Sequence, residues 1–198
     1  MKIGIDKKIQ FDTDFIKMKP HMHRDFWDEK VLLPEIEEAL LKIAEDVYKS
    51  MDIDVPYDDI TITGSLASMS WHQGSDIDLH ILLDFSKISD NLELVKRALD
   101  QSRINWNKTH DIFIKGHEVE IYFQDIDEDH QSLGVYSLLR NEWTKKPTNQ
   151  EVDIDLKSAE KKADTISADI DHALDLYDNK KYKDAYIYAI KIRRKIKK

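Results

Sequence analysis

Asp76 and Asp78 are separated by one residue at the start of an apolar segment, and this spacing can place two carboxylates side by side. From residue 77 to residue 83 every second residue is apolar, which is typical of a strand with one buried face. Residues two apart in a strand share a face, so Asp76, Asp78 and His80 should point away from the core together. Neighbouring carboxylates repel each other unless a cation lies between them. Mg²⁺ takes one or two protein carboxylates and keeps positions for water and phosphate, so the pattern predicts metal-dependent chemistry on a phosphate.

A Gly-Ser pair, Gly64-Ser65, precedes these aspartates with ten residues between them. The β-branched run at 58–63 predicts a strand before the pair, and residues 66–71 predict a short helix after it. A glycine lets the backbone approach a phosphate closely, and the first turn of a helix offers free N–H groups. The Ser65 hydroxyl adds one more donor. The segment therefore predicts a phosphate-binding turn next to the carboxylates.

A third carboxylate is expected from residues 111–125, which predict a β-hairpin that turns at a Lys-Gly pair. Glu118, Glu120 and Tyr122 would share the polar face of its second strand. Glu120 is the better candidate for a metal site because apolar residues flank it on both sides. The alternative is that both glutamates only face solvent. His80 could touch the phosphate-bearing ligand, orient a carboxylate or serve a structural role alone.

The Asp-x-Asp spacing has little specificity by itself, because an acidic chain repeats it by composition. It also occurs at Asp12/Asp14, Asp52/Asp54, Asp125/Asp127, Asp127/Asp129, Asp153/Asp155 and Asp169/Asp171. Only Asp76 and Asp78 combine it with an apolar strand, an upstream Gly-Ser turn and a downstream strand that carries another acid. We therefore interpret this pair as functional and the other pairs as solvated surface, with an ordinary acidic strand end as the alternative for Asp76 and Asp78.

The combination of these features resembles the DNA polymerase β-like nucleotidyltransferase superfamily over roughly residues 30–125. More narrowly, most of the chain resembles nucleotidyltransferase-like proteins of tailed phages. The matching segments are Phe26-Trp27-Asp28, Thr63-Gly64-Ser65-Leu66-Ala67, Ser75-Asp76-Ile77-Asp78-Leu79-His80, Val119-Glu120-Ile121-Tyr122 and Gly134-Val135-Tyr136-Ser137.

The resemblance implies an α/β (α+β) fold, a small mixed sheet with helices packed on one side. It also implies a divalent metal, Mg²⁺ or Mn²⁺, held by three catalytic carboxylates, Asp76, Asp78 and Glu120. The nucleoside triphosphate, expected to be ATP, would be bound by Gly64, Ser65 and Ser75.

The expected reaction moves a nucleoside monophosphate from the triphosphate to an acceptor hydroxyl by a two-metal mechanism. Glu120 would complete the site nearest the acceptor and help to deprotonate its hydroxyl. Catalysis would rest on positioning and charge neutralisation more than on covalent chemistry. Three classes of acceptor stay open: RNA, a small molecule and a protein. The base preference of the enzyme and its oligomeric state also stay open.

One departure from the superfamily pattern concerns phosphate binding. Many small members carry an arginine and a second glycine shortly after Gly-Ser, whereas this chain has Ser68 and Met69 in that neighbourhood. Lys96, Arg97 or Arg103 could supply a cation from elsewhere. Two alternatives to an active enzyme therefore stay open. One is an antitoxin-like module that binds or modifies a partner protein, and the other is a phage protein that binds nucleotide without turnover.

We expect the 198-residue chain to be cytoplasmic, in the cytoplasm of the host if the protein is phage-encoded. The chain has no cysteine, which excludes disulfides and thiolate metal sites and fits a reducing compartment. We find no signal-peptide pattern at its start, and no apolar run approaches the roughly 20 residues of a membrane helix. The net charge of −9 argues against broad, non-specific binding to nucleic acid.

Three regions are expected along the chain: a polar N-terminal segment at 1–29, the nucleotidyltransferase core at 30–145 and a helical extension at 146–198. In the core, helices are expected to begin at Pro34 and at Asn91. The segment from Gly134 to Trp143 predicts a short helix or a strand-like cover.

The extension is expected to form a helical hairpin, with helices at about 156–177 and 182–197. Its last eight residues, 191–198, are strongly basic. They fit either a helix end whose cations complement its dipole or a local contact with RNA or phosphate. The helical pattern ends without a stop signal, as it would in a shortened form of a longer protein.

Overall fold

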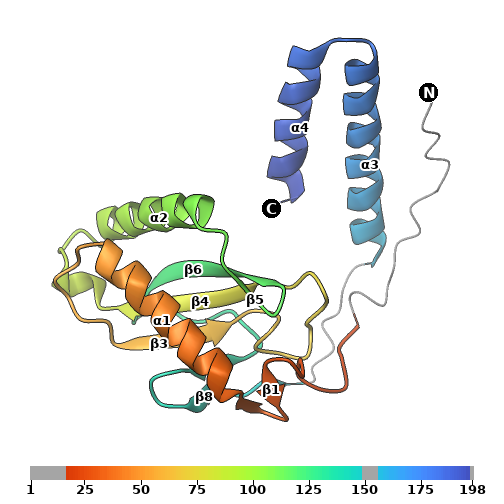
Figure 1. Cartoon of the computed structure of the whole chain (residues 1–198). Helices are drawn as coiled ribbons and strands as arrows, with labels where there is room; N and C mark the ends of the chain where they lie inside the picture. The colour runs from red at the N-terminus through yellow and green to blue at the C-terminus, as the bar shows by residue number, and fades with distance from the viewer. Residues whose placement is uncertain (1–16, 149–155, 197–198) are drawn as a thin grey trace. The chain divides into compact units, whose positions relative to one another are not determined.

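A computed structural model describes residues 17–148 and 156–196 of the chain (Figure 1). These residues form two units, one within 17–148 and one within 156–196, and each is described here by itself. The first unit contains a six-stranded mixed sheet with helices, and the second contains two helices. The predicted mixed α/β (α+β) fold with a C-terminal helical pair is therefore confirmed.

The six strands of the sheet lie in the order β5-β6-β4-β3-β7-β8. Their bounds are β3 Asp59–Thr63, β4 Ile77–Leu83, β5 Phe113–Ile114, β6 His117–Asp125, β7 Val135–Ser137 and β8 Glu142–Lys145. The neighbouring strands β4 and β6 are parallel, and every other neighbouring pair is antiparallel. A separate short ribbon pairs β1, Trp27–Asp28, with β2, Val31–Leu32.

Two long helices border this sheet. Helix α1, Pro34–Ser50, begins with proline in its first turn and turns its buried stripe, Ile36, Leu40, Ala44 and Val47, to the core. Helix α2, Leu92–Thr109, is capped by the Asn91 side chain, which accepts a hydrogen bond from the Leu94 N–H. A 3₁₀ turn, η2 at Phe85–Lys87, lies between β4 and α2. Helix α1 contacts β4, whereas α2 contacts β6, the long strand that follows it in the chain (Figure 1).

Strand β4 shows the predicted alternation. Its odd-numbered residues from Ile77 to Leu83 are at most 1% exposed, and the residues between them are half-buried. The predicted hairpin also forms, because Lys115 and Gly116 both have positive φ between β5 and β6. One face of the sheet is therefore apolar and packed, and the opposite face carries the candidate site.

Within residues 17–29, three apolar side chains are part of the packed core. Met22, Phe26 and Trp27 are 2–3% exposed and belong to the hydrophobic core cluster. The Trp27 indole N–H donates to the Leu66 carbonyl at 2.8 Å, and its ring stacks on Trp143. These apolar residues stand among polar ones without a period, which is why composition alone did not reveal their burial.

The helix predicted at 66–71 does not form, because turns occupy residues 64–70. The Ser68 hydroxyl donates to the Ser65 carbonyl and accepts from the Ser70 N–H, so side chains replace helical hydrogen bonds here. The Gly134–Trp143 segment forms strand β7 and the start of β8, which selects the strand-like one of the two predicted alternatives.

The second unit consists of α3, Leu156–Asp178, and α4, Tyr182–Ile196. The two helices contact each other, and Lys180 adopts a positive φ of 60° in the turn between them. The predicted hairpin around residues 178–179 is confirmed. Among the described residues, no helix is long and apolar enough to cross a membrane.

The first prediction tests the role of residues 17–29 in the core. Phe26→Ala should lower the free energy of unfolding by about 3–5 kcal/mol, because it removes a buried aromatic ring from the core. Val31→Ala, at a 63% exposed position five residues later, should change it by no more than about 0.5 kcal/mol. Urea denaturation of both variants measures the difference, and equal effects would show that this segment does not contribute to the core.

Candidate active site

The register of the three central strands brings the predicted residues together on the polar face of the sheet. Thr63 on β3 pairs with Asp78 on β4, and Asp78 pairs with Glu120 on β6. Glu118 lies two residues earlier, opposite Phe113 of β5, so only Glu120 is level with Asp78. Asp76 lies just before β4 and is exposed. The geometry therefore supports Glu120 over Glu118 as the partner of Asp78.

The Asp78 carboxyl group is largely shielded from water and lies near two other acids. Its pKa is raised from 3.8 to about 6, chiefly by burial, with the negative charges of Glu120 and Asp76 acting in the same direction. The three carboxylates are therefore close enough to influence one another. A cation among them would lower the electrostatic cost of keeping Asp78 ionised.

Gly64 passes directly over Asp78. It has a φ of 74°, and a Cβ atom built on it would lie 1.8 Å from Asp78 Oδ2. No other residue fits there, because a side chain would overlap the carboxylate and the positive φ would be strained. The Gly64 N–H donates to the Ser132 hydroxyl at 2.9 Å. The structure thus explains the glycine by its approach to Asp78, and a contact with triphosphate stays a prediction.

Ser65 and Ser75 are joined to each other beside this turn. The Ser65 hydroxyl donates to the Ser75 hydroxyl at 2.7 Å, and the Ser75 oxygen also accepts from the His72 N–H at 2.9 Å. Ser75 is only 3% exposed. Both serines therefore fix the path of the chain into Asp76, and their predicted contact with nucleotide is not tested by this arrangement.

Tyr122 holds the side chain of Glu120. Its hydroxyl donates to Glu120 Oε2 at 2.6 Å, and the guanidinium of Arg103 lies 4.7 Å from the centre of its ring. Burial and the acceptor Glu120 raise the pKa of the Tyr122 hydroxyl well above its usual range, so it stays a donor. One oxygen of Glu120 is consequently oriented by a neutral phenol.

His80 is held as a neutral ring by a chain of hydrogen bonds. The Gln124 amide donates to the Glu128 carbonyl, so its oxygen accepts from His80 Nδ1 at 2.7 Å. His80 Nε2 then accepts from the Thr63 hydroxyl at 3.0 Å. Burial lowers the pKa of His80 to about 4. Of its three predicted roles, these contacts favour the structural one.

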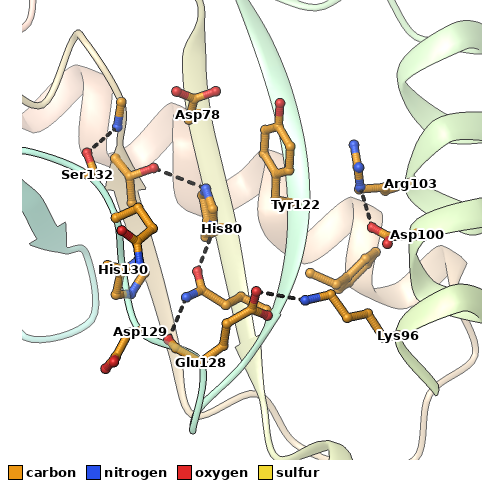
Figure 2. Close-up of a pocket in the computed structure, with 15 residues that line it drawn as sticks. Asp78, His80, Lys96, Asp100, Arg103, Tyr122, Glu128, Asp129, His130 and Ser132 are labelled. Carbon is orange, nitrogen blue, oxygen red and sulfur yellow. Dashed lines mark hydrogen bonds and ion pairs between the residues drawn. The ribbon is translucent and has the colours of Figure 1, made fainter. Parts of the chain in front are cut away.

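A pocket of about 600 Å³ opens beside Asp78 on this face of the sheet. Figure 2 shows Asp78, His80 and Tyr122 along neighbouring strands, with side chains of α2 approaching from one side and the 128–132 segment from the other. The α2 side chains in its wall are Lys96, Asp100 and Arg103. The opposite wall includes Glu128, Asp129, His130 and Ser132.

The pocket distinguishes the three cations that could replace the absent arginine. Lys96 and Arg103 line it, although each also pairs with an acid: Lys96 with Glu128 at 2.7 Å and Arg103 with Asp100 at 2.8 Å. Arg97 lies on α2 between them, pairs with Glu93 and is 76% exposed. The spacing of seven residues between Lys96 and Arg103 is two helical turns, a signal that was present in the sequence.

Three further residues shape the site without having been singled out as site residues. Ser132 accepts from Gly64, Gln124 orients His80, and Gly134 allows the strand entering β7 to approach the turn. A Cβ atom on Gly134 would lie 2.0 Å from the Ala67 carbonyl oxygen. From the sequence, a glycine shortly before a strand gives only a weak signal that two backbone segments approach closely. Ser132 could not be found in this way, because it lies in a segment without periodicity.

The carboxylate oxygens of this site are the type of ligand that a hard cation prefers. Asp78 and Glu120 present carboxylate oxygens from adjacent strands, and Mg²⁺ uses one or two protein carboxylates. In residues 17–148 and 156–196, however, no group of three or more His, Cys, Asp or Glu side chains is placed to hold a metal ion. The hydrogen bond from Tyr122 occupies one of the two carboxylate oxygens of Glu120. Metal binding by Asp76, Asp78 and Glu120 therefore stays a prediction.

Comparison of the chain with protein-family models, with curated proteins and with solved structures finds no match in any of the three. The resemblance to the nucleotidyltransferase superfamily accordingly rests on the motif residues of the sequence alone.

The second prediction concerns the energetic effect of ionised Asp78 without metal. Its folded-state pKa is raised to about 6, so ionisation destabilises the fold as pH rises from 3.8 through 6. Asp78→Asn should therefore raise the free energy of unfolding at pH 7.5 in EDTA, by about 2–3 kcal/mol, and have little effect near pH 4.

Urea denaturation at both pH values, with Asp58→Asn at an exposed position as the control, measures this difference. Destabilisation by Asp78→Asn at both pH values would show that the carboxylate makes net favourable contacts in the fold.

Proposed function

We propose that the protein is a metal-dependent nucleotidyltransferase that moves a nucleoside monophosphate from a triphosphate to an acceptor hydroxyl and releases pyrophosphate. The observation that carries this proposal is the register of β4 and β6, which sets Asp78 and Glu120 side by side beneath the Gly64 turn. The raised pKa of Asp78 adds to it, because a buried carboxylate near two other acids favours a bound cation. The adjoining pocket has room for a substrate.

In this proposal Asp76, Asp78 and Glu120 would hold Mg²⁺ or Mn²⁺, which would supply charge neutralisation for the triphosphate and would lower the pKa of the acceptor hydroxyl. Glu120 is the candidate to receive the hydroxyl proton. Tyr122 orients it for that task, since its hydroxyl occupies one carboxylate oxygen and leaves the other for the acceptor or the cation. Arg103 holds the Tyr122 ring from the α2 side.

The triphosphate would extend from Asp78 into the pocket, where Lys96 and Arg103 supply positive charge. Both are paired with acids in the described conformation, so they would have to exchange partners to contact phosphate. ATP is the donor to test first. An RNA, a small molecule or a protein would supply the acceptor hydroxyl.

Nucleotide binding without turnover is the second candidate function. It is favoured by the engagement of Glu120 with Tyr122 and by the acidic partners of both pocket cations. The two functions are separated by incubating the protein with each labelled triphosphate, Mg²⁺ or Mn²⁺, and either total RNA or lysate. Transfer of label to any acceptor supports the enzyme. Metal-dependent triphosphate binding without transfer supports the second candidate, and the absence of both contradicts the proposal.

The third prediction separates the two glutamates of β6. Glu120→Gln should abolish metal-dependent transfer, because it removes the charge level with Asp78, while triphosphate binding partly survives on Asp76 and Asp78. Glu118→Gln should keep most activity. Label transfer and calorimetric binding of ATP with Mg²⁺ give the two readouts. Full activity in Glu120→Gln would remove this residue from the site.

The fourth prediction concerns the cations of α2. Arg103→Ala should weaken binding of ATP with Mg²⁺ by about tenfold, the value of one hydrogen bond between charged groups. Arg97→Ala is the matched control on the same helix, since Arg97 pairs with Glu93 outside the pocket, and it should bind ATP like the wild type. Calorimetry measures both. Equal affinities in the two variants would place the triphosphate elsewhere.

A further inference from the structure

Residues 17–24 form a basic segment beside the loop between β3 and β4. The segment contains Lys17, Lys19 and Arg24 together with two histidines, and it has no aspartate or glutamate, although the whole chain has a net charge of −9. Its backbone is joined to the loop, because the Lys19 N–H donates to the Met69 carbonyl at 2.6 Å. The 17–24 segment therefore adds local positive charge beside the loop that contains the predicted phosphate-binding turn.

Aromatic rings accompany these cations. The Trp71 indole N–H donates to the His21 carbonyl at 2.8 Å, and the two rings stack with their centroids 6.0 Å apart. The Lys19 ammonium lies 6.0 Å from the centre of the Trp71 ring. Both rings are half-buried, so part of each is accessible to solvent. Surfaces that bind single-stranded nucleic acid combine these two features, because bases stack on aromatic rings while cations pair with the phosphates.

A second pocket, of about 460 Å³, adjoins the 17–24 segment. Its lining includes three apolar and three charged side chains: Met22, Trp27, Leu33, Arg24, Asp28 and Glu29. A bare anion would be repelled by the two carboxylates. A nucleotide, in contrast, presents a phosphate to the arginine and the amino group of adenine, guanine or cytosine to a carboxylate. The lining therefore fits one nucleotide of a strand better than an inorganic anion or an acidic peptide.

His21, which also lines this pocket, has a feature that favours RNA over DNA. Its Nδ1 atom lies 2.9 Å from the Met22 carbonyl oxygen, which can only accept, so Nδ1 carries a proton. In the neutral ring Nε2 is then an acceptor. The 2′-hydroxyl of RNA can donate to such an atom, whereas DNA has no hydroxyl at that position.

His72 connects the 17–24 segment with the candidate active site. Burial lowers the pKa of His72, the charge of Asp76 raises it, and the charge of Lys19 lowers it. His72 is therefore close enough to both residues to respond to their charges. A strand bound along the segment would consequently lie close to one of the three carboxylates predicted to hold the metal.

We infer that the 17–24 segment, Trp71 and the second pocket bind single-stranded RNA. The cations of the segment pair with phosphates, the rings stack with bases, and one nucleotide enters the pocket. Duplex RNA fits less well, because its bases are stacked on one another and are shielded from protein rings.

The inference rests on the proposed function in one respect, which is that the bound RNA supplies the acceptor. A ribose hydroxyl oxygen of the strand attacks the α-phosphorus of the triphosphate and forms the new P–O bond. The bond to pyrophosphate breaks, and the hydroxyl proton passes to Glu120. RNA binding itself does not require this step and can be measured without it.

The first experiment measures RNA binding by the full chain in EDTA without triphosphate. Fluorescence anisotropy follows a labelled single strand of about 12 nucleotides in about 50 mM salt. Lys19→Ala and Arg24→Ala should each weaken binding about fivefold to tenfold. Each should also reduce the slope of log K against log salt by about 0.7, the value for one phosphate contact with a single strand.

Lys49→Ala is the matched control for these two variants. Lys49 is exposed on α1 and pairs with Glu45, so its loss removes one positive charge away from the 17–24 segment. This variant should bind RNA like the wild type. Equal losses in the control and the segment variants, or a wild-type dissociation constant above about 100 µM, would overturn the inference.

The second experiment tests the choice of RNA over DNA and over duplex. The wild type should bind the RNA strand about threefold to tenfold more tightly than DNA of the same sequence, the value of one hydrogen bond. His21→Phe keeps a ring but removes the acceptor, so it should bind both strands equally, with its melting temperature as the check on folding. A wild type without this preference, a preference that His21→Phe keeps, or equal affinity for duplex RNA would contradict the inference.

The results also separate this inference from the proposed function. RNA binding that depends on Lys19 and Arg24, without transfer of label from any triphosphate, would support the inference and contradict the enzyme. Transfer of label to a small molecule or to a protein, by a chain that does not bind RNA, would support the enzyme and overturn the inference.

Discussion

The carboxylate of Asp78 is the constraint on which the arrangement of the polar face depends. It lies between two other acids in a site largely shielded from water, so every neighbour must leave it room or limit its repulsion. Gly64 is one consequence, since any Cβ atom at that position would overlap Asp78 Oδ2. Ser132 is another, because its hydroxyl holds the backbone of that glycine in place. The Gly64 turn, the 128–132 segment and strand β6 are thus arranged around one carboxyl group.

The opposite face of the sheet provides the stability that this arrangement requires. Strand β4 is the shared element, because its odd-numbered residues lie in the core and its even-numbered residues carry Asp78 and His80. Burial of apolar side chains between α1 and the sheet contributes about 1.5–3 kcal/mol for each fully buried residue. That gain exceeds the destabilisation expected from one ionised Asp78, so the fold can hold a carboxylate whose environment favours its neutral form. Such a carboxylate is typical of functional sites, where local stability is given up for binding.

Periodicity predicted the parts of this structure that depend on which face of an element is buried. The alternation in β4, the hairpin that ends in β6 and the buried stripe of α1 follow directly from residue spacing. The position of Glu120 beside Asp78 also follows from the spacing, given that β4 and β6 are parallel. The helix predicted at 66–71 failed because serine side chains supplied the hydrogen bonds that a helix would have supplied. The burial of Phe26 and Trp27 was not predicted, because isolated apolar residues have no period. Lys96 and Arg103 could be named as cations, but only the packing of α2 against β6 places them at the pocket.

The hydrogen bonds of His80 explain why the Thr63 hydroxyl does not relieve the charge of Asp78. Thr63 faces Asp78 across the strands and carries a hydroxyl that could donate to it. That hydroxyl proton is already committed, because His80 donates through Nδ1 to Gln124 and must therefore accept at Nε2 from Thr63. Gln124 in turn is fixed by its donation to the Glu128 carbonyl. This chain of hydrogen bonds directs the Thr63 hydroxyl away from Asp78. The surroundings of the Asp78 carboxylate therefore favour either a proton on it or a cation beside it.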